Sequence, residues 1–145
     1  MLDAHNNYRS DIRTGKELRQ NMAKHLPDLI WDDDLALNAQ KAAESCVIED
    51  DPTTYAGTDR HHRVGQNTFT SAKLNISGVE AVKKWYNEIE YYNFNENSCS
   101  FICQHYLQIV WANTTAIGCS RHICENLNGF EGEPAALILC HYLEK

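Results

Sequence analysis

The stretch QHYLQIVWANT (residues 104–114) joins an apolar helical pattern to one histidine and one glutamine. Its spacing predicts a short helix that buries Leu107, Val110 and Trp111 and carries His105 and Gln108 together on another face. His105 then has three candidate roles, which are chemistry, metal binding and filling of the interior. The choice depends on which side chains the rest of the chain brings next to it.

Length and charge limit the class of protein. A chain of 145 residues fits one domain, residues 1–145, with a substantial core. The formal net charge is -7 and no Lys/Arg cluster interrupts it, so nucleic acid and anionic membranes are poor partners. No apolar run approaches the roughly 20 residues of a transmembrane helix. The N-terminus lacks the apolar core of a secretory signal, so we expect either a cytosolic protein or one whose signal has been removed.

The cysteines favour an oxidising compartment. Six form an even set, and Asn75 and Asn113 begin glycosylation sequons, so we expect a secreted glycoprotein. The alternative is six buried free thiols and two chance sequons. The spacings lack the paired Cys-x2-Cys units of structural zinc sites. Cys99 and Cys103 are near enough in sequence to bridge locally, and Cys119 and Cys140 lie in strand-like runs that could pair.

Hydrophobic spacing predicts mostly helices first and strands later. Helices are expected over 2–13, from an Asp32–Asp34 cap to Cys46, and over 79–92. Residues 64–70 form a strand, 93–101 a loop, and 117–124 with 135–142 an antiparallel hairpin. This order predicts an α+β layered sandwich.

Glu88 lies within the apolar stripe of the 79–92 helix, where a carboxylate needs a partner. His105 is the candidate, because a carboxylate beside an imidazole can fix its tautomer, share a proton or bind a cation. The two can equally satisfy each other without further function. There is no Gly-x-Ser-x-Gly elbow or His-Glu-x-x-His helix, and His61 and His62 are interpreted as a solvated loop.

Aromatic residues concentrate near residues 85–101. Such a cluster can cover a flat apolar ligand, and its alternative is ordinary core. Its members are Trp85, Tyr86, Tyr91, Tyr92, Phe94 and Phe101.

Taken together, a set of motifs resembles the CAP superfamily, which contains cysteine-rich secretory, antigen 5 and pathogenesis-related 1 proteins. The likeness spans nearly the whole chain and is strongest to venom allergen-like proteins of parasitic worms. The motifs are His5-Asn6-x-x-Arg9, Trp31 with Leu35-Ala36-x-x-Ala39-Gln40 and Cys46, Gly65-Gln66-Asn67, Trp85-x-x-Glu88, His105-Tyr106-x-Gln108-x-Val110-Trp111, Ile117-Gly118-Cys119 and Cys140-x-Tyr142.

The resemblance implies a three-layer α-β-α sandwich with a central antiparallel sheet, and a cavity in which two His and two Glu hold a divalent cation. The corresponding positions here are Asp50, Gln66, Glu88 and His105, so two of the four are replaced. We therefore expect no tight metal site and no cofactor, with at most a weak divalent cation on Glu88 and His105 if His61 or His62 approaches. The implied disulfides are Cys46–Cys124, Cys99–Cys103 and Cys119–Cys140.

The resemblance also implies lipid ligands, because the family has no settled enzymatic activity and some members bind sterols or fatty acids. The sterol loop corresponds to Tyr92, Phe94 and Phe101. A fatty-acid channel between the helices of 2–13 and 79–92 would be lined by apolar side chains, although spacing does not separate a channel wall from a filled core. These are Leu2, Tyr8, Ile12, Val82 and Tyr86.

The expected function is therefore that of a secreted, non-enzymatic lipid-binding protein, which sequesters or exports sterols and fatty acids and modulates immunity at the host–parasite interface. One alternative is a surface ligand of host plasma or immune proteins that does not use the cavity. The other is a metal-assisted hydrolase built on His105 and Glu88.

Overall fold

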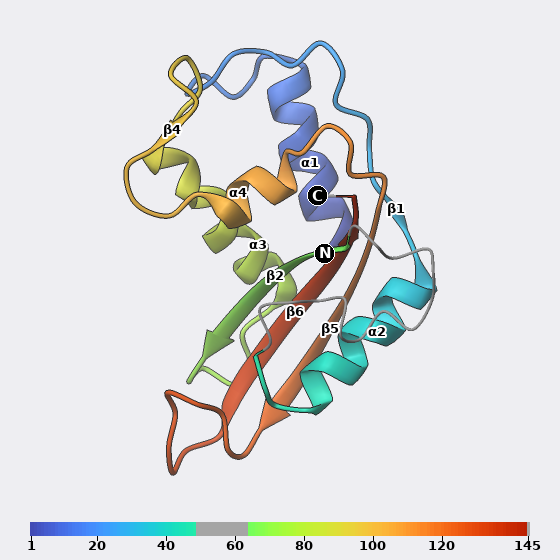
Figure 1. Ribbon diagram of the computed structural model, residues 1–145, viewed down its shortest axis with the longest axis vertical. Coiled ribbons are helices and arrows are strands. Elements are labelled where there is room, and N and C mark those ends of the chain that lie inside the picture. Colours follow the sequence, from blue (N-terminus) through green and yellow to red (C-terminus); the bar gives the residue numbers. More distant parts are fainter. Residues whose placement is uncertain (49–63, 145) are drawn as a thin grey trace.

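The centre of the protein is an antiparallel hairpin of two long strands, β5 (Ala116–Cys124) and β6 (Ala135–Leu143) (Figure 1). The computed structural model describes residues 1–48 and 64–144. Nearly every residue of β6 is buried, because helices cover both faces of the sheet; its sequence AALILCHYL accordingly shows little polar alternation. The hairpin that the sequence predicts is confirmed.

The sheet has four strands in the order β1-β5-β6-β2. Strand β2 (Val64–Ser71) runs antiparallel to β6, whereas β1 (Ile30–Trp31) runs parallel to β5. The expected antiparallel sheet therefore has one parallel edge of two residues.

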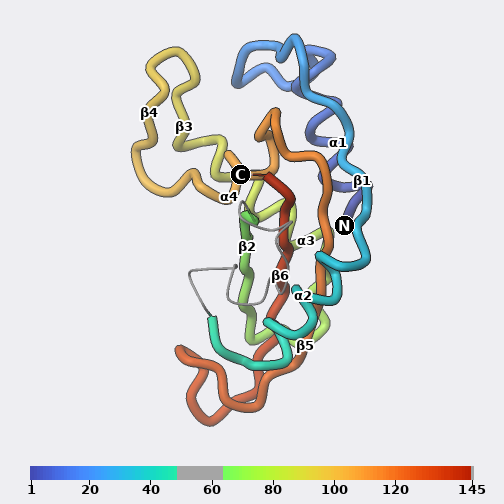
Figure 2. The backbone as a smooth tube through the Cα atoms, turned by 45° about the vertical axis from the view of Figure 1, so that its right-hand side comes forward, coloured from blue at the N-terminus to red at the C-terminus, as the bar shows by residue number. Residues whose placement is uncertain are grey.

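Helices form a layer on each face of this sheet (Figures 1 and 2). Helices α1 (Leu2–Arg13), α3 (Gly78–Tyr86) and α4 (Gln104–Ile109) pack together on one face. Helix α2 (Asp33–Glu44) packs on the other. The predicted three-layer α-β-α sandwich is confirmed.

Helix α2 lies very close to the sheet. The Asp32 carboxylate accepts a hydrogen bond from Leu35 N at 3.0 Å and so caps the helix, as the sequence predicts. Gly118 of β5 lies beneath the first turn, where an added Cβ would stand 2.0 Å from Ala36 N. Only glycine permits this approach of backbone to backbone.

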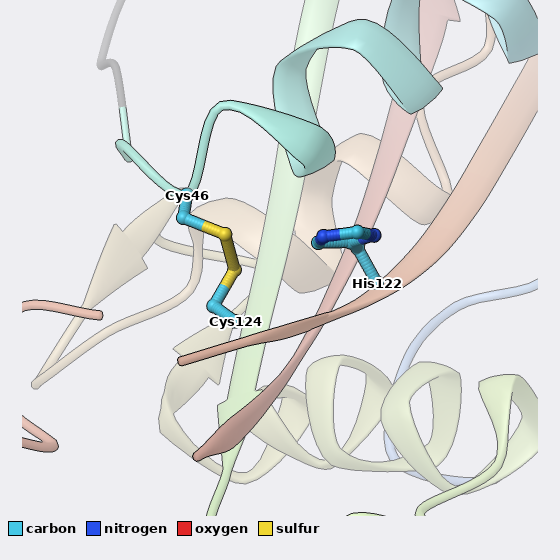
Figure 3. Close-up of side chains that lie close together, drawn as sticks. All are labelled: Cys46, His122 and Cys124. Carbon is cyan, nitrogen blue, oxygen red and sulfur yellow. A yellow bond between two sulfur atoms is a disulfide. The ribbon is translucent and has the colours of Figure 1, made fainter. Parts of the chain in front are cut away.

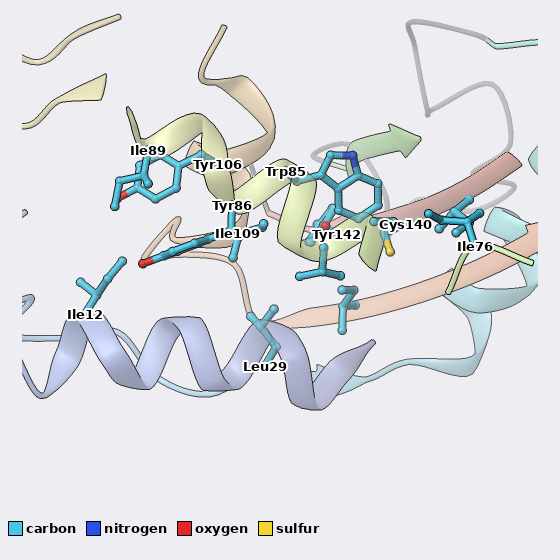
Figure 4. Close-up of a cluster of buried hydrophobic side chains, with 14 of the residues drawn as sticks. Ile12, Leu29, Ile76, Trp85, Tyr86, Ile89, Tyr106, Ile109, Cys140 and Tyr142 are labelled. Atoms are coloured by element: carbon cyan, nitrogen blue, oxygen red, sulfur yellow. The ribbon is translucent and has the colours of Figure 1, made fainter. Parts of the chain in front are cut away.

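The opposite face holds the largest apolar cluster (Figure 4). Trp85 and Tyr86 of α3, Tyr106 of α4 and Tyr142 of β6 are buried in it. Tyr8 of α1 stacks on Tyr86 with ring centroids 3.9 Å apart, which fills the space between α1 and α3 at this point.

The helix predicted over residues 79–92 changes character partway. A capping box between Ser77 and Glu80 begins α3, which ends at Tyr86 and continues as the 3-10 helix η3 (Asn87–Tyr91). The predicted loop then contains a small hairpin of β3 (Tyr92–Asn93) and β4 (Ser98–Cys99). Apolar spacing persists through both helix types, so it does not mark the change.

The predicted buried face of α4 is wrong for Trp111 and is met only in part by Leu107 and Val110, which pack against the core cluster. Tyr106 and Ile109 are buried, Leu107 and Val110 only partly so, and Trp111 is 43 % exposed. The helix ends at Ile109 and Trp111 lies beyond it, so helical spacing does not fix where the Trp111 side chain points.

Two polar residues of α1 hold the irregular segment 14–29 against the sandwich. The Asn6 side chain donates to Leu29 O and accepts from Leu29 N, at 3.0 and 2.7 Å. Buried Arg9 donates to the carbonyls of Pro27, Ile109 and Trp111 at 2.8 to 3.0 Å, and burial lowers its pKa to about 10. These bonds explain why polar residues occupy the inner face of α1.

Three disulfides tie the elements together, and they are the pairs that the family resemblance implies. They are Cys46–Cys124, Cys99–Cys103 and Cys119–Cys140.

None of the helices in the described ranges combines the length and the apolar character that crossing a bilayer requires.

Candidate functional site

Glu88 and His105 lie side by side where η3 meets α4. His105 Nδ1 donates to Glu88 Oε1 at 2.6 Å, and Glu88 Oε2 accepts the backbone N–H groups of His105 and Tyr106 at 3.0 and 3.1 Å. Cys103, the residue before α4, makes no side-chain cap. Glu88 therefore caps α4 from another helix, and both of its oxygens are occupied.

A second polar chain runs beneath this pair. Asn67 Nδ2 donates to the carbonyl of His105 at 3.0 Å and to the Tyr142 hydroxyl at 3.1 Å. The Tyr142 oxygen lies 2.8 Å from His5 Nε2, and His5 Nδ1 lies 2.8 Å from Met1 O. Because a carbonyl only accepts, Nδ1 carries the proton in the neutral ring and Tyr142 donates to Nε2. Each acceptor in this series of hydrogen bonds, from Met1 to His105, thus has a donor.

Burial sets the protonation of these groups. It lowers the pKa of His5 to about 4, helped by the N-terminal amine and Arg9 and opposed by the bond to Met1. Burial also raises the pKa of Tyr142. Both side chains are therefore neutral near pH 7, which suits a structural polar network.

Of the three predicted cavity positions that the structure describes, Gln66 lies apart from Glu88 and His105. Gln66 is paired in register with His141, and its Oε1 accepts from His141 Nε2 at 2.9 Å. His141 alternates along β6 with Cys140 and Tyr142, which face α1, α3 and α4, so Gln66 lies on the opposite, α2 side of the sheet.

Three further candidates, Asp50, His61 and His62, lie outside the described residues. Among the described cavity positions, which are Gln66, Glu88 and His105, the side chains of Glu88 and His105 are in contact.

A cation held by Glu88 and His105 at once would have to displace existing hydrogen bonds, since His105 Nδ1 and both Glu88 oxygens are used, and His105 Nε2 alone is left as a ligand atom of the pair. In the described part of the chain, three potential metal ligands meet instead at Cys46, His122 and Cys124 (Figure 3). The two sulfurs are bonded to each other at 2.08 Å, so neither is the thiolate that a metal requires.

An apolar pocket of about 230 Å³ lies at the other end of α4. Its walls come from α1, from the segment 20–26, from the β3 region and from α4 and the residues after it. The aliphatic lining residues are Ile12, Ala23, Leu26, Leu107, Val110 and Ala112, and the aromatic ones are Tyr92, Phe94 and Trp111.

This pocket takes residues from both predicted lipid sites. Ile12 belongs to the predicted channel, and Tyr92 and Phe94 belong to the predicted sterol loop. Phe101 does not line it and instead packs edge-on against Tyr91, with ring centroids 5.4 Å apart. The other predicted channel residues pack in or against the apolar cluster between α1 and α3. They are Leu2, Tyr8, Val82 and Tyr86.

The segment that closes the pocket is pinned to the core. Glu17 accepts from the Tyr86 hydroxyl at 3.0 Å, and the Tyr106 hydroxyl donates to Gln20. Hydrogen bonds from Arg19 are the main reason that the pKa of Glu17 falls to about 2, so this carboxylate stays charged under ordinary conditions. Sequence spacing did not predict this wall, because segment 14–29 has neither helix nor strand periodicity.

A polar cleft of about 660 Å³ adjoins the pocket, between residues 18–21 and residues 90–100. Figures 1 and 2 show these segments at the same end of the molecule, away from the β5–β6 turn. Leu18 and Phe101 beside it are 90 % and 72 % exposed, and Met22 is 63 % exposed. Contiguous apolar patches mark interaction surfaces, whereas single exposed apolar residues are ordinary, so these three side chains are candidates for such a surface.

The two predicted glycosylation positions, Asn75 and Asn113, are both exposed in segments between helices and strands.

Comparison with known proteins identifies the family. The model of the "CAP: Cysteine-rich secretory protein family" matches residues 2–142. Peptidase inhibitor 16 of Mus musculus is 34 % identical over 144 residues, which cover 98 % of this chain and 26 % of the relative. The CRISP/Allergen/PR-1 protein of Trittame loki is 35 % identical over 156 residues, covering 98 % and 37 %. The chain thus spans between 26 % and 37 % of the length of these two relatives.

The structure of venom allergen-like protein 4 from Schistosoma mansoni superimposes with a TM-score of 0.81 at 29 % identity, covering 99 % of this chain and 84 % of that one. The fold, the three disulfides and the match over residues 2–142 lead to one conclusion. This chain belongs to the cysteine-rich secretory protein (CAP) family.

Proposed function

We propose that the protein binds apolar ligands, foremost fatty acyl chains, in the pocket lined by Ile12, Tyr92 and Phe94, and that it does so without catalysis. The observation that carries this proposal is that the polar pair is occupied by hydrogen bonds within the protein, whereas the apolar pocket is open. The Glu88–His105 pair is satisfied internally, whereas the pocket presents apolar walls to an open space.

The size of the pocket favours a chain over a ring system. A volume of about 230 Å³ equals about eight groups of water size and lies below the roughly 300–1,000 Å³ of typical ligand sites. A segment of an alkyl chain fits it as it stands. A sterol fits only if segment 18–26 or the β3–β4 hairpin moves, so sterol binding is the weaker part of the proposal.

The disulfides favour a secreted protein. All six cysteines form disulfides, which persist in oxidising compartments, and the matching family is described as secretory. A role at the host–parasite interface draws support from the likeness to the Schistosoma protein. Glycans at Asn75 and Asn113 are part of the same proposal.

The test is equilibrium binding of a fluorescent fatty acid to matched variants. Ala23→Leu adds three carbons inside the pocket and should weaken binding about tenfold or more. Ala72→Leu makes the same change at an exposed position and should leave affinity unchanged. Unaltered binding by Ala23→Leu would show that the ligand lies elsewhere.

A metal-assisted hydrolase is the alternative that the geometry supports least. Such an enzyme needs a cation with an open coordination position, and the Glu88 oxygens already serve His105 and the N-terminus of α4. We therefore expect zinc titration to show no micromolar site that His105→Ala removes. A site of that strength would favour the hydrolase.

Exposed Leu18, Met22 and Phe101 favour a second candidate, a surface ligand of host plasma or immune proteins. Replacing all three with serine should abolish such an interaction and leave fatty-acid affinity nearly unchanged. A loss of both together would tie the exposed surface to lipid uptake instead.

A further inference from the structure

The apolar pocket and the polar cleft adjoin and share part of their lining. Gln20, Tyr92 and Phe94 line both spaces, so a ligand that passes these three side chains occupies both. The Tyr92 hydroxyl donates to Asn97 Oδ1 at 2.9 Å, which holds its ring at the junction. A ligand that fits both spaces has an apolar part and a polar part.

The charge of the cleft indicates which polar group of a ligand would bind there. Among the lining residues in the described ranges, Arg19 is the cation, and it donates to both carboxylate oxygens of Glu17 at 2.9 and 2.8 Å. Its third nitrogen lies 4.0 Å from Glu90. Glu96 adds another carboxylate to the lining. The described lining thus carries one guanidinium, which is already paired with Glu17, and two carboxylates, so the lining is negative by one formal charge.

Aromatic rings lie in the same wall. Tyr91 and Phe94 are 43 % and 46 % exposed and line the cleft beside Glu90 and Glu96. Rings combined with carboxylates recognise ammonium groups, because the face of the ring attracts a cation that the carboxylate also attracts. An anionic head would be repelled by the same carboxylates.

We propose that the cleft binds the head of a single-chain amphiphile whose head is an organic cation, with its alkyl chain in the adjoining pocket. This inference rests on the proposed function, because it requires that the pocket accept an alkyl chain. It narrows that function from apolar ligands in general to chains with an ammonium head. The chain length that the pocket holds is about eight carbons, from its volume of about 230 Å³.

The experiment compares three probes by calorimetry at low ionic strength. Octyltrimethylammonium carries both parts, octanoate carries the same length of chain with an anionic head, and tetramethylammonium carries the head alone. We expect octyltrimethylammonium to bind about tenfold more tightly than octanoate, the size of one cation–π contact aided by a carboxylate. Tetramethylammonium should bind more weakly than octyltrimethylammonium.

Variants test whether the ammonium head lies in the cleft and the alkyl chain lies in the pocket. The double variant Glu90→Gln with Glu96→Gln should lower the affinity for octyltrimethylammonium about tenfold and should not weaken octanoate. Ala23→Leu should weaken both. Glu133→Gln, which changes an exposed carboxylate in the β5–β6 turn, should change neither.

The outcomes separate the two proposals. Equal affinity for octyltrimethylammonium and octanoate, or an equal loss of both in the double variant, would overturn the cationic head and leave chain binding in place. If no octyl compound binds and fluorescent fatty acids also fail to bind, the proposed function itself falls.

Discussion

The two ends of α4 differ in whether the side chains around them are bonded to one another or line open space. At its N-terminus, in what we call the closed region, hydrogen bonds join partly exposed Glu88 and His105 and link buried Asn67, Tyr142 and His5 to the same helix end. Beyond its C-terminus the pocket and the cleft leave aromatic and apolar surface open. The difference teaches that clustered polar residues in the centre of a fold can be structural, while open apolar surface, here the proposed binding surface, forms where irregular segments meet. The closed region should respond to mutation through stability and the open region through affinity.

The largest effect is expected at Gly118. In Gly118→Ala the new Cβ would overlap the backbone of α2 at Ala36, where it would stand 2.0 Å from the nitrogen. The loss should reach about 5 kcal/mol, comparable to the whole stability of a marginal domain. Gly129→Ala is the control, since its φ of +91° strains alanine but its surroundings are open, and it should lose only about 1–2 kcal/mol. Chemical denaturation measures both, and equal losses would contradict the close packing of α2.

Removing one disulfide from each region compares how much each crosslink contributes to stability. Removing Cys46–Cys124, which spans 78 residues of the sandwich, should cost about 4.5 kcal/mol from chain entropy. Removing Cys99–Cys103, which spans 4 residues beside the open end, should cost about 2 kcal/mol. Double alanine variants in denaturant titrations test this order. A reversed order would mean that the β3–β4 end carries more of the stability than its open structure indicates.

Acid should weaken the closed region through His5. Its pKa is about 4 in the folded protein against 6.5 unfolded, so the unfolded chain binds the extra proton between these values. The contribution is full above pH 6.5 and should fall by about 3 kcal/mol as the pH drops to 4. Unfolding curves across this range should show a smaller slope for His5→Gln and an unchanged slope for exposed His25→Gln. Identical slopes for all three proteins would refute a neutral buried His5.

Glu88 and Glu90 give the smallest and sharpest contrast, being two residues apart in η3. Glu88→Gln weakens the cap of α4 and the bond to His105, and should cost about 1.5 kcal/mol. Glu90→Gln affects a carboxylate that is 64 % exposed and should cost under about 0.5 kcal/mol. Thermal unfolding of the two variants measures the difference. Equal stability would show that Glu88 is not a structural cap.

The sequence predicted the layers well because periodicity reports burial. The α2 face of Leu35, Ala39 and Ala42 and the β5–β6 hairpin follow from spacing alone. The partnership of Glu88 with His105 was also accessible, because a carboxylate inside an apolar stripe needs a partner.

The rest depended on contacts that spacing does not encode. Gln66 was assigned to the cavity by resemblance, yet the alternation of β2 turns it toward His141. The pocket arises where segment 20–26 meets Tyr92 and Phe94, and irregular segments carry no periodic signal of where they pack. The exposed side chain of Leu18 could not be separated from a core leucine by its residue type.

The central claim is that apolar ligands bind at the open end and not at Glu88 and His105. Backbone amide shifts in an NMR titration with 1-octanol, which has no charged head, test it most directly. We predict that the largest shifts fall in residues 20–26, 92–94 and 107–112, with His105 and Tyr142 little affected. The largest shifts at Glu88, His105 and Asn67, with none around Ala23, would contradict the account.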